Sequence, residues 1–386
     1  MNKFYILYLF CLSINFCSCD LERIELGSGS ETKFSTTVGS SGDDYPSDMI
    51  VNTDGSIVIV GTSKYNNTSS AYLVKLDKNG NQLWEKNLGG LADSEAHAVI
   101  ATSDGGYILC GSTVVLNIDL YVVKVNSLGT EVWSKSYGAA DSIEVGFGLA
   151  VIGTNDLMIG YTSTLDLANK SVRFMRLNSN GSRISDKLGI TRASFFINEM
   201  IKTTDNKMVI VGSQFVSTST SYIAKFMEDG GFIWEQNYSG PIDNYAPGYG
   251  VVEMPDKSLF LAGSYLGNND HDFLVVNYSE IGMEVIDKSW GGANPDELMS
   301  ITNTQDGEIV VLGYTQSFST TQEIYLSKRK KSDGSEIWAK HFSETWGNSG
   351  GAVRLCPDGG FALCTRQDQG DADIIVIKTD ANGNYQ

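Results

Sequence analysis

Residues 102–138 read TSDGGYILCGSTVVLNIDLYVVKVNSLGTEVWSKSYG, and the rest of the chain repeats this stretch, with drift, about every fifty residues. The stretch passes from a tight turn through two apolar runs separated by a polar loop, and ends in a Gly turn and a strand that carries Trp133. A period of about 20 to 50 residues indicates an architecture of stacked repeats. The number of copies therefore determines the fold.

Two marks follow the repeat independently. One mark closes the second strand of each copy, which is the first apolar run of the stretch quoted above. Its members are Gly61, Gly111, Gly160, Gly212, Gly263, Gly313 and Thr365. The other is a bulky residue on the last strand, five residues before a Gly or Ser, and its members are Phe34, Trp84, Trp133, Ile184, Trp234, Ile286 and Trp338. Successive members of both series lie 49 to 52 residues apart, so insertions between copies are small.

Each copy predicts four strands. In the quoted copy these are Ala98–Thr102, Tyr107–Cys110, Leu120–Val125 and Glu131–Tyr137. Asp-Gly and Asn-Gly pairs at the turns tolerate the positive φ of tight hairpins. We therefore expect an all-β fold, a single seven-bladed β-propeller of four-stranded antiparallel blades. The last copy stops at Gln386 before its Trp strand, whereas Phe34 lies on a strand without a blade, so the N-terminal strand should close the last blade and leave no open edge.

Composition agrees with an all-β chain and excludes some partners. Of 386 residues, 41 are Gly and only 6 are Pro, and no long helical tract is present. The formal net charge of −18 opposes binding to nucleic acid. Beyond residue 19 the chain has three cysteines, Cys110, Cys356 and Cys364, each in or beside an apolar run. We expect them to be small buried hydrophobes rather than a disulfide framework or a zinc site.

The first residues predict export. Lys3 precedes an apolar run, Phe4–Phe16, that is too short to span a membrane and suits the core of a signal peptide. The following Phe16-Cys17-Ser18-Cys19 resembles a bacterial lipobox, and Cys19, preceded by the small Ser18, is the better lipid acceptor. The alternative is an ordinary signal peptide cleaved nearby. The expected divisions are a signal peptide at 1–18, a lipidated Cys and flexible tether at 19–31, and a propeller at 32–386.

The repeats also carry a resemblance. The pattern DGGYILCGS, a strand ending VVKV, a Gly turn and EVWSKSYG resembles the propeller repeats of exported Bacteroidota proteins, and more distantly the Trp-docked repeats of quinoprotein dehydrogenases. Asp20 and Glu22 after Cys19 resemble the acidic tag of surface-exposed Bacteroidota lipoproteins. The first resemblance implies an outer-membrane, cell-surface lipoprotein, with a periplasmic orientation or secretion as alternatives. The second implies a quinone and calcium, but the chain lacks the adjacent cysteines of those enzymes, so we expect no cofactor.

The regular aromatic positions favour packing over chemistry. Phe34, Trp84, Trp133, Trp234 and Trp338 should fill the wedge between blades. The segments at 75–81 and 379–384 share letters with calcium loops but lack the Glu six residues beyond the Gly, so they predict plain turns. The three His residues, His97, His271 and His341, belong to separate elements, and no G-x-S-x-G accompanies them. Paired carboxylates in the loops remain open as catalytic groups.

A candidate binding face follows from the topology. In such a meander the connections between the second and third strands, and those between blades, lie on one face, which we name the loop face; the tight turns lie on the other, the tight-turn face. Long loops are expected, for example Thr62–Ala71 and Ser112–Asp119. The aromatic candidates on the loop face are Tyr45, Tyr65, Phe215, Tyr245, Tyr249, Tyr265, Phe318 and Trp346. In the loop between two blades, Asp141-Ser142-Ile143 resembles a Bacteroidota O-glycosylation acceptor.

Two classes of function remain open. The first is a non-catalytic lipoprotein scaffold that binds another outer-membrane or surface protein, as part of a secretion, assembly or uptake complex. The second is a glycan-binding or glycan-degrading propeller, or a remote quinoprotein. Aromatic residues among acids suit a protein or a glycan. The sequence specifies no catalytic residues.

Overall fold

We describe a computed structural model of the chain. It covers residues 32–386, apart from 91, 167–168, 216–218, 241–245, 268–269, 320, 343–345, 370 and 386; the side chains of 165–166, 169, 346–350, 368–369 and 371 are not described either. The predicted signal peptide, the lipidation of Cys19 and the tether all lie outside the described residues. Within them, no helix has the length and apolar character needed to cross a membrane.

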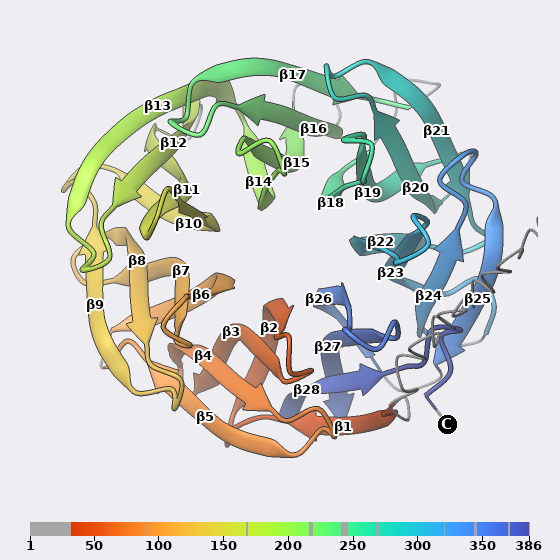
Figure 1. Cartoon of the computed structure of the whole chain (residues 1–386), viewed down its shortest axis with the longest axis horizontal. Helices are drawn as coiled ribbons and strands as arrows, with labels where there is room; N and C mark the ends of the chain where they lie inside the picture. Colours follow the sequence, from red (N-terminus) through yellow and green to blue (C-terminus); the bar gives the residue numbers. More distant parts are fainter. Residues whose placement is uncertain are drawn as a thin grey trace, which may run out of the picture. The chain divides into compact units, whose positions relative to one another are not determined.

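The described residues form seven four-stranded antiparallel sheets arranged as blades of a ring, so the chain is a seven-bladed β-propeller (Figure 1). Blades 1 to 3 are β2 (Asp43–Val51), β3 (Ile57–Tyr65), β4 (Thr68–Leu76) and β5 (Gln82–Leu88); β6 (Asp93–Ala101), β7 (Tyr107–Val114), β8 (Ile118–Val125) and β9 (Glu131–Tyr137); and β10 (Ile143–Ile152), β11 (Asp156–Asp166), β12 (Asn169–Leu177) and β13 (Arg183–Ala193). Blades 4 to 6 are β14 (Phe195–Lys202), β15 (Met208–Phe215), β16 (Ser219–Phe226) and β17 (Phe232–Tyr238); β18 (Gly248–Glu253), β19 (Leu259–Leu266), β20 (His271–Tyr278) and β21 (Glu284–Trp290); and β22 (Asp296–Asn303), β23 (Ile309–Thr315), β24 (Glu323–Arg329) and β25 (Glu336–Phe342). Blade 7 is β26 (Trp346–Leu355), β27 (Phe361–Gln369), β28 (Asp371–Lys378) and β1 (Phe34–Val38).

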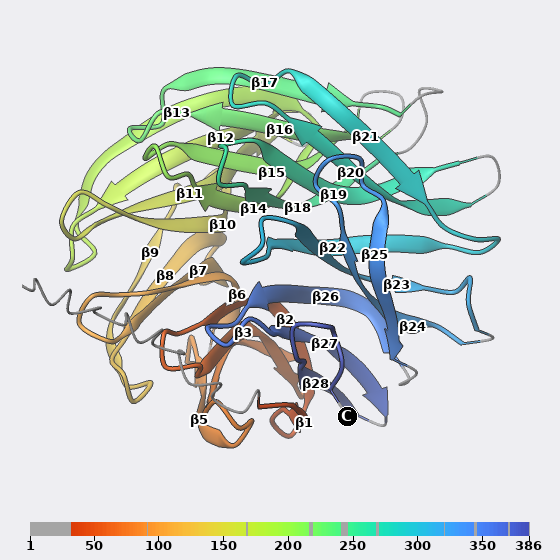
Figure 2. The ribbon, with the colours of Figure 1, turned by 45° about the vertical axis from the view of Figure 1, so that its right-hand side comes forward.

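The predicted closure by the N-terminal strand is confirmed. β1 pairs antiparallel with β28, from Phe34 opposite Lys378 to Val38 opposite Ile374. The first and last strands of the ring therefore belong to one sheet, and no blade lacks its outer strand (Figure 1). The outer strands follow one another around the rim, as β13, β17 and β21 do in Figure 2.

Most of the loops predicted between the second and third strands are wrong. β3 and β4 extend through the segment predicted as the loop Thr62–Ala71, and only Asn66 and Asn67 separate them. Both have positive φ, 49° and 64°, which Asn tolerates in a two-residue hairpin. Ser and Thr in these segments belong to paired strands, so the composition resembles a loop although the backbone does not. The loop face thus consists mainly of projecting hairpins.

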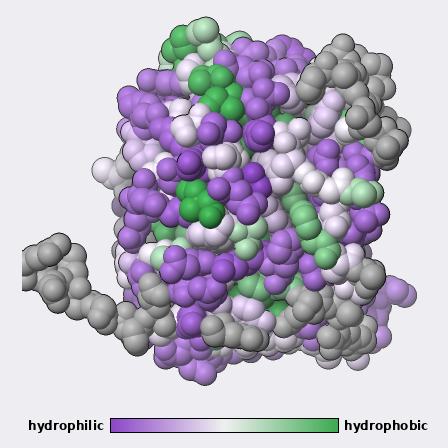
Figure 3. Space-filling view, turned by 90° about the vertical axis from the view of Figure 1, so that its right-hand side faces the viewer, coloured by the Kyte–Doolittle hydropathy of each residue, from purple (hydrophilic) through white to green (hydrophobic). Residues whose placement is uncertain are grey.

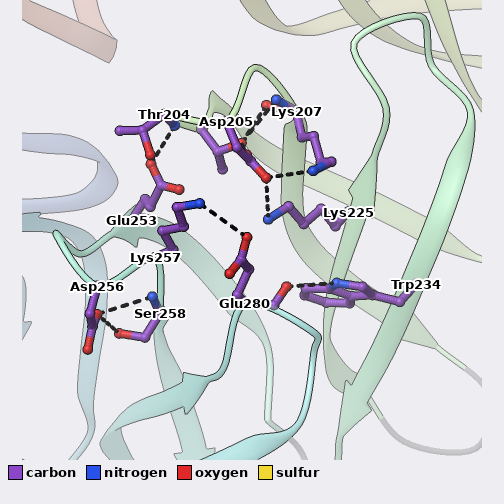
Figure 4. Close-up of polar contacts among 11 residues, drawn as sticks. Thr204, Asp205, Lys207, Lys225, Trp234, Glu253, Asp256, Lys257, Ser258 and Glu280 are labelled. Carbon is purple, nitrogen blue, oxygen red and sulfur yellow. Dashed lines mark hydrogen bonds and ion pairs between the residues drawn. The ribbon is translucent and has the colours of Figure 1, made fainter.

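The Trp series docks one blade onto the next. Trp84 Nε1 donates to the carbonyl of Ser127, 3.3 Å away, and its ring occupies the place where a side chain at Gly129 would stand. The same contacts recur from Trp133 to the turn at Ser179 and Gly181, and from Trp234 to the turn at Glu280 and Gly282. Figure 4 shows the Trp234 bond to the Glu280 carbonyl. Phe34 and Trp338 meet Gly80 and Gly383 in the equivalent way. The packing role predicted for these aromatics is therefore consistent with their contacts.

The two Ile residues of the series do not fill this place. Ile184 is 53% exposed, and Phe174 contacts Gly230 instead. In blade 5 the turn glycine Gly334 meets Lys288 rather than Ile286, and the Trp290 ring lies 3.4 Å from the Arg329 guanidinium of blade 6. An aliphatic side chain is too short to reach the next turn, so another residue makes the contact.

A β-bulge explains the Gly series. In blades 1 to 6 the register of the innermost strand slips by one residue against its neighbour. In five blades the bulged backbone brings a carbonyl so close to the opposite Gly that a Cβ there would overlap it; these are Gly61, Gly111, Gly212, Gly263 and Gly313. In blade 7, Thr365 pairs with Gly351 and the register is regular from there to the end of the strand, whereas the irregularity lies on the other side of this pair, between Trp346 and Gly351. Blade 3 corrects the prediction, because Tyr161 rather than Gly160 holds this position, opposite Gly146.

The two faces and the rim differ in their chemistry. Lysines on the tight-turn face pair with turn acids, as Lys207 and Lys225 do with Asp205 and Lys257 does with Glu280 (Figure 4). Seen from the side of β21 and β25, the rim is mainly polar and its apolar side chains form separate spots (Figure 3). The rim therefore offers no continuous apolar surface on this side.

Candidate binding site in the central channel

Six bulged residues line the central cavity of the ring. They are Ser47, His97, Phe147, Asn198, Tyr249 and Met299, one from the innermost strand of each of blades 1 to 6. The cavity encloses about 180 Å³. A bulge redirects a side chain and is common beside functional sites. Here it turns one residue in each of blades 1 to 6 toward the axis.

These six residues differ from blade to blade, whereas the packing positions around them repeat. The register positions carry Gly, Trp or aliphatic residues in most copies, but the bulged position is in turn a hydroxyl, an imidazole, a phenyl, an amide, a phenol and a thioether. Repetition of the scaffold together with variation at one position indicates that the position serves something other than packing. We name these six residues the bulge ring.

An ion-pair girdle crosses the channel below the bulge ring. Arg354 of blade 7 lies 2.6 Å from Asp48 of blade 1 and 3.4 Å from Glu199 of blade 4, on the other side of the channel. The three side chains retain only 19 to 25% exposure. Burial raises the pKa of Glu199, and the charge of Arg354 opposes that rise. The girdle narrows the channel, so a ligand entering from the loop face meets it as the floor.

Backbone N–H groups fix the girdle residues. Asp48 accepts a hydrogen bond from Val99 N at 3.0 Å, and Glu199 accepts one from Val251 N at 2.9 Å. Each bond joins the innermost strands of neighbouring blades. A carboxylate held by a backbone donor from one side and a guanidinium from another has little freedom. The floor of the channel is therefore rigid.

The channel widens toward the loop face. Two adjoining cavities, of about 430 and 290 Å³, share Ser47 and Asn198 with the central cavity. The larger one is lined by Lys170 and Phe196, and the Lys170 ammonium lies 3.9 Å from the Phe196 ring. Burial lowers the pKa of Lys170. Cavities of this size with aromatic walls and a few polar groups suit a small ligand or one residue of a larger one.

The aromatic residues predicted on the loop face differ in exposure and location. Tyr65, Phe215 and Phe318 are exposed, by 55, 44 and 55%. Tyr249 lies in the bulge ring and lines the channel. Tyr265 is 7% exposed and packs against Gly240, so its assignment to an exposed binding face is wrong.

The remaining aromatic residues predicted on the loop face give no support to an exposed binding surface. Tyr45 lies between Lys64 and Arg366, 5.1 and 4.5 Å from its ring centre, and is partly buried by them. The side chains of Tyr245 and Trp346 lie outside the described residues. Ser142, in the segment resembling a glycosylation acceptor, is 3% exposed and donates its hydroxyl to Glu144, so the folded chain does not present it.

The His residues are separated, as predicted. His97 is in the bulge ring and lies 3.3 Å from Glu95, whereas His271 and His341 pair with Glu297 and Glu323 elsewhere. In the described part of the chain, no group of three or more His, Cys, Asp or Glu side chains could hold a metal ion. Asp77 and Asp380 accept N–H bonds from their own turns, consistent with the plain turns predicted at 75–81 and 379–384.

Sequence reasoning missed the bulge ring and the girdle. Both depend on which residue of a strand faces the axis, and a bulge changes this by one residue. The sequence does contain one sign of the bulge ring: its members recur every 50 or 51 residues, each just upstream of an apolar run. Without the register, that position is indistinguishable from its neighbours.

Comparisons with known proteins point to the fold. A family model described as "Domain of unknown function (DUF5122) beta-propeller" matches residues 53–82. No curated protein sequence matches the chain. Similar solved structures include the polysaccharide lyase Uly1, with a TM-score of 0.59, 10% identity, and coverage of 91% of this chain and 100% of that chain. They also include the BP39L lectin from Burkholderia pseudomallei, with a TM-score of 0.59, 10% identity, and coverage of 92% and 97%.

Proposed function

We propose that the protein is a non-catalytic binding or scaffold subunit, held at the outer membrane through a lipid on Cys19, whose loop face receives another membrane or surface protein. The observation that carries this proposal is the exposure of large apolar side chains on hairpins of four blades. These are Tyr65, Val115, Leu116, Phe215 and Phe318, exposed by 44 to 100%. Such residues on projecting hairpins are typical of protein-binding surfaces.

Charge narrows the chemistry of the partner. Acids stand near the starts of strands on this face, for example Asp43, Asp93 and Asp119, whereas acids in the tight turns have lysine partners, as Asp104 has in Lys124 and Asp306 in Lys328. A partner segment with apolar side chains and basic neighbours would complement this arrangement. The channel mouth behind it could take one inserted side chain, with the girdle as its floor.

The point at which the chain enters the ring supports a loop face that is turned away from the lipid attachment. Phe34 packs on Gly80, which belongs to a tight turn, so β1 enters the ring at the tight-turn face. A lipid attached upstream of β1 would be joined to the ring, through the predicted tether, at that face. The loop face then points away from the attachment and is open to a partner.

Pull-down from detergent-solubilised membranes tests the proposal, with two matched variants. Tyr65→Ser combined with Phe318→Ser alters the loop face, and Leu83→Ser combined with Val132→Ser alters the rim at 54 and 56% exposed positions. A stoichiometric partner retained by the rim variant and lost by the loop-face variant is the expected result. Equal capture by both variants, or none by the unmodified protein, would contradict the proposal.

A glycan is the second candidate, and the mouth of the channel favours it. Lys170, Asn198 and Tyr249 place a cation, an amide and a phenol around cavities bounded by aromatic rings, which is a set of groups that suits a sugar. The neighbours of similar fold include a lectin and a polysaccharide lyase. Binding on a glycan panel that Tyr249→Ala abolishes would support this candidate, and release of unsaturated or reducing ends would make it an enzyme.

A further inference from the structure

Connections between blades repeat a Gly followed by a buried polar residue. The polar residue stands near the start of the innermost strand, five or six positions after the Gly. The pairs are Gly39 and Asp44, Gly89 and Ser94, Gly138 and Glu144, and Gly291 and Asp296. The four polar side chains are at most 5% exposed. A buried carboxylate needs hydrogen-bond donors or a cation, so the partners of the three acids decide their roles.

Two of the acids are fully bonded. Asp44 accepts from Ser40 N at 2.5 Å through one oxygen and from the Ser40 hydroxyl at 3.3 Å through the other. Asp296 likewise accepts from Gly292 N at 2.9 Å, while its other oxygen accepts from Thr315. In both cases a backbone N–H of the connection reaches the carboxylate. Both oxygens of each carboxylate therefore have a donor, although each acid also faces a second carboxylate across its glycine, Asp373 at Gly39 and Asp272 at Gly291.

Glu144 differs because its connection is longer. Six positions separate it from Gly138, whereas five separate the other acids from their glycines. Its Oε1 accepts from the hydroxyls of Ser142 and Ser163, the latter at 3.0 Å. Its Oε2 is buried and has no hydrogen-bond partner, although the whole residue is only 5% exposed. One oxygen of a buried carboxylate is thus left without a donor.

Asp119 of blade 2 faces the same place. A Cβ added at Gly138 would lie less than 3.0 Å from both Asp119 Oδ1 and Glu144 Oε2, so the two carboxylates flank the space that the glycine leaves. Nearby in the chain, the carbonyls of Ala139 and Ser142 accept from the Asn117 amide, the first at 3.3 Å. The Ala139 carbonyl also accepts from Ser142 N at 3.3 Å, whereas the Ser142 carbonyl keeps a second lone pair that can serve another group. The groups around the space at Gly138 are therefore mainly oxygen atoms, from the carboxylates of Asp119 and Glu144.

We propose that Glu144 and Asp119 bind a calcium ion between blades 2 and 3. Two facing carboxylates repel each other, and a hard divalent cation relieves both this repulsion and the orphan oxygen. Since the side chains described here provide two carboxylates rather than three, the Ser142 carbonyl and water would complete the shell. Sites of this composition in extracellular modules have dissociation constants of about 10⁻⁴ to 10⁻³ M. The ion would join two blades, and the proposal is independent of the function proposed above.

Thermal unfolding with and without calcium tests the site. The melting temperature of the unmodified protein should rise by about 2 to 4 °C between EGTA and 10 mM CaCl₂, with ionic strength matched by NaCl. Glu144→Gln should melt at or above the unmodified protein in EGTA, because its amide removes the repulsion and can donate to Asp119. Glu144→Gln and Asp119→Asn should lose the calcium response, and Asp77→Asn, in a turn that bonds itself, should keep it.

Isothermal titration should give one calcium ion per chain for the unmodified protein and none for Glu144→Gln. A melting temperature unaffected by calcium would overturn the proposal. A response that persists in both site variants would also overturn it, since it would reflect general neutralisation of an acidic protein. A gain in stability on acidification that Glu144→Gln lacks, together with no effect of calcium, would overturn it as well.

Discussion

Phe34→Ala tests how the ring closes. Phe34 is half-buried, packs against the cluster that contains Val38 and Ile374, and occupies the place of a side chain at Gly80. Truncating a fully buried Phe costs about 3 to 5 kcal/mol of unfolding free energy. Because Phe34 is half-buried and lies on an outer strand, we expect about 2 kcal/mol. The loss should exceed that of any exposed Phe, since this side chain joins the two ends of the chain.

Guanidinium unfolding followed by Trp fluorescence measures the effect, with two comparison variants. Phe318→Ala removes the same atoms from a 55% exposed position and should cost less than about 0.5 kcal/mol. Phe34→Trp introduces the residue that Trp84, Trp133 and Trp234 supply in other blades, and should preserve stability. If Phe34→Ala unfolds at the same denaturant concentration as Phe318→Ala, β1 does not contribute to ring closure as described.

Three further outcomes are expected. Gly111→Ala should destabilise by about 3 kcal/mol, because its Cβ would overlap a carbonyl, whereas Thr365→Ala should cost less than about 1 kcal/mol; urea unfolding compares them. Arg354→Met leaves Asp48 and Glu199 uncompensated and should cost about 2 to 4 kcal/mol at pH 7, with a smaller loss for Arg354→Lys, both measured by calorimetry. A hydrogen bond from Lys124 lowers the pKa of Asp104 to about 2, so the pair stabilises the fold above pH 4. Asp104→Asn should therefore lose no more than about 1 kcal/mol at pH 7, and its difference from the unmodified protein should vanish as pH falls toward 2.

The sequence by itself determined the number of blades, the order of their strands and the closing strand. Its marks are local: a Gly at a turn, a Trp at a fixed distance beyond it, and an apolar run that must be buried. Each recurs because every blade solves the same packing problem, so the period is visible without coordinates. The place of β1 followed because Phe34 falls on the period of a series that blade 7 leaves incomplete.

The tertiary structure alone decided what the channel and the interfaces between blades contain. A bulge of one residue reverses which side chain faces the axis, so Tyr249 enters the channel only once the register with β19 is known. Burial of Tyr265 depends on Gly240 of a neighbouring connection. Asp119 and Glu144 meet because two blades pack side by side. Such contacts depend on the relative placement of strands, which the periodicity of a sequence does not encode.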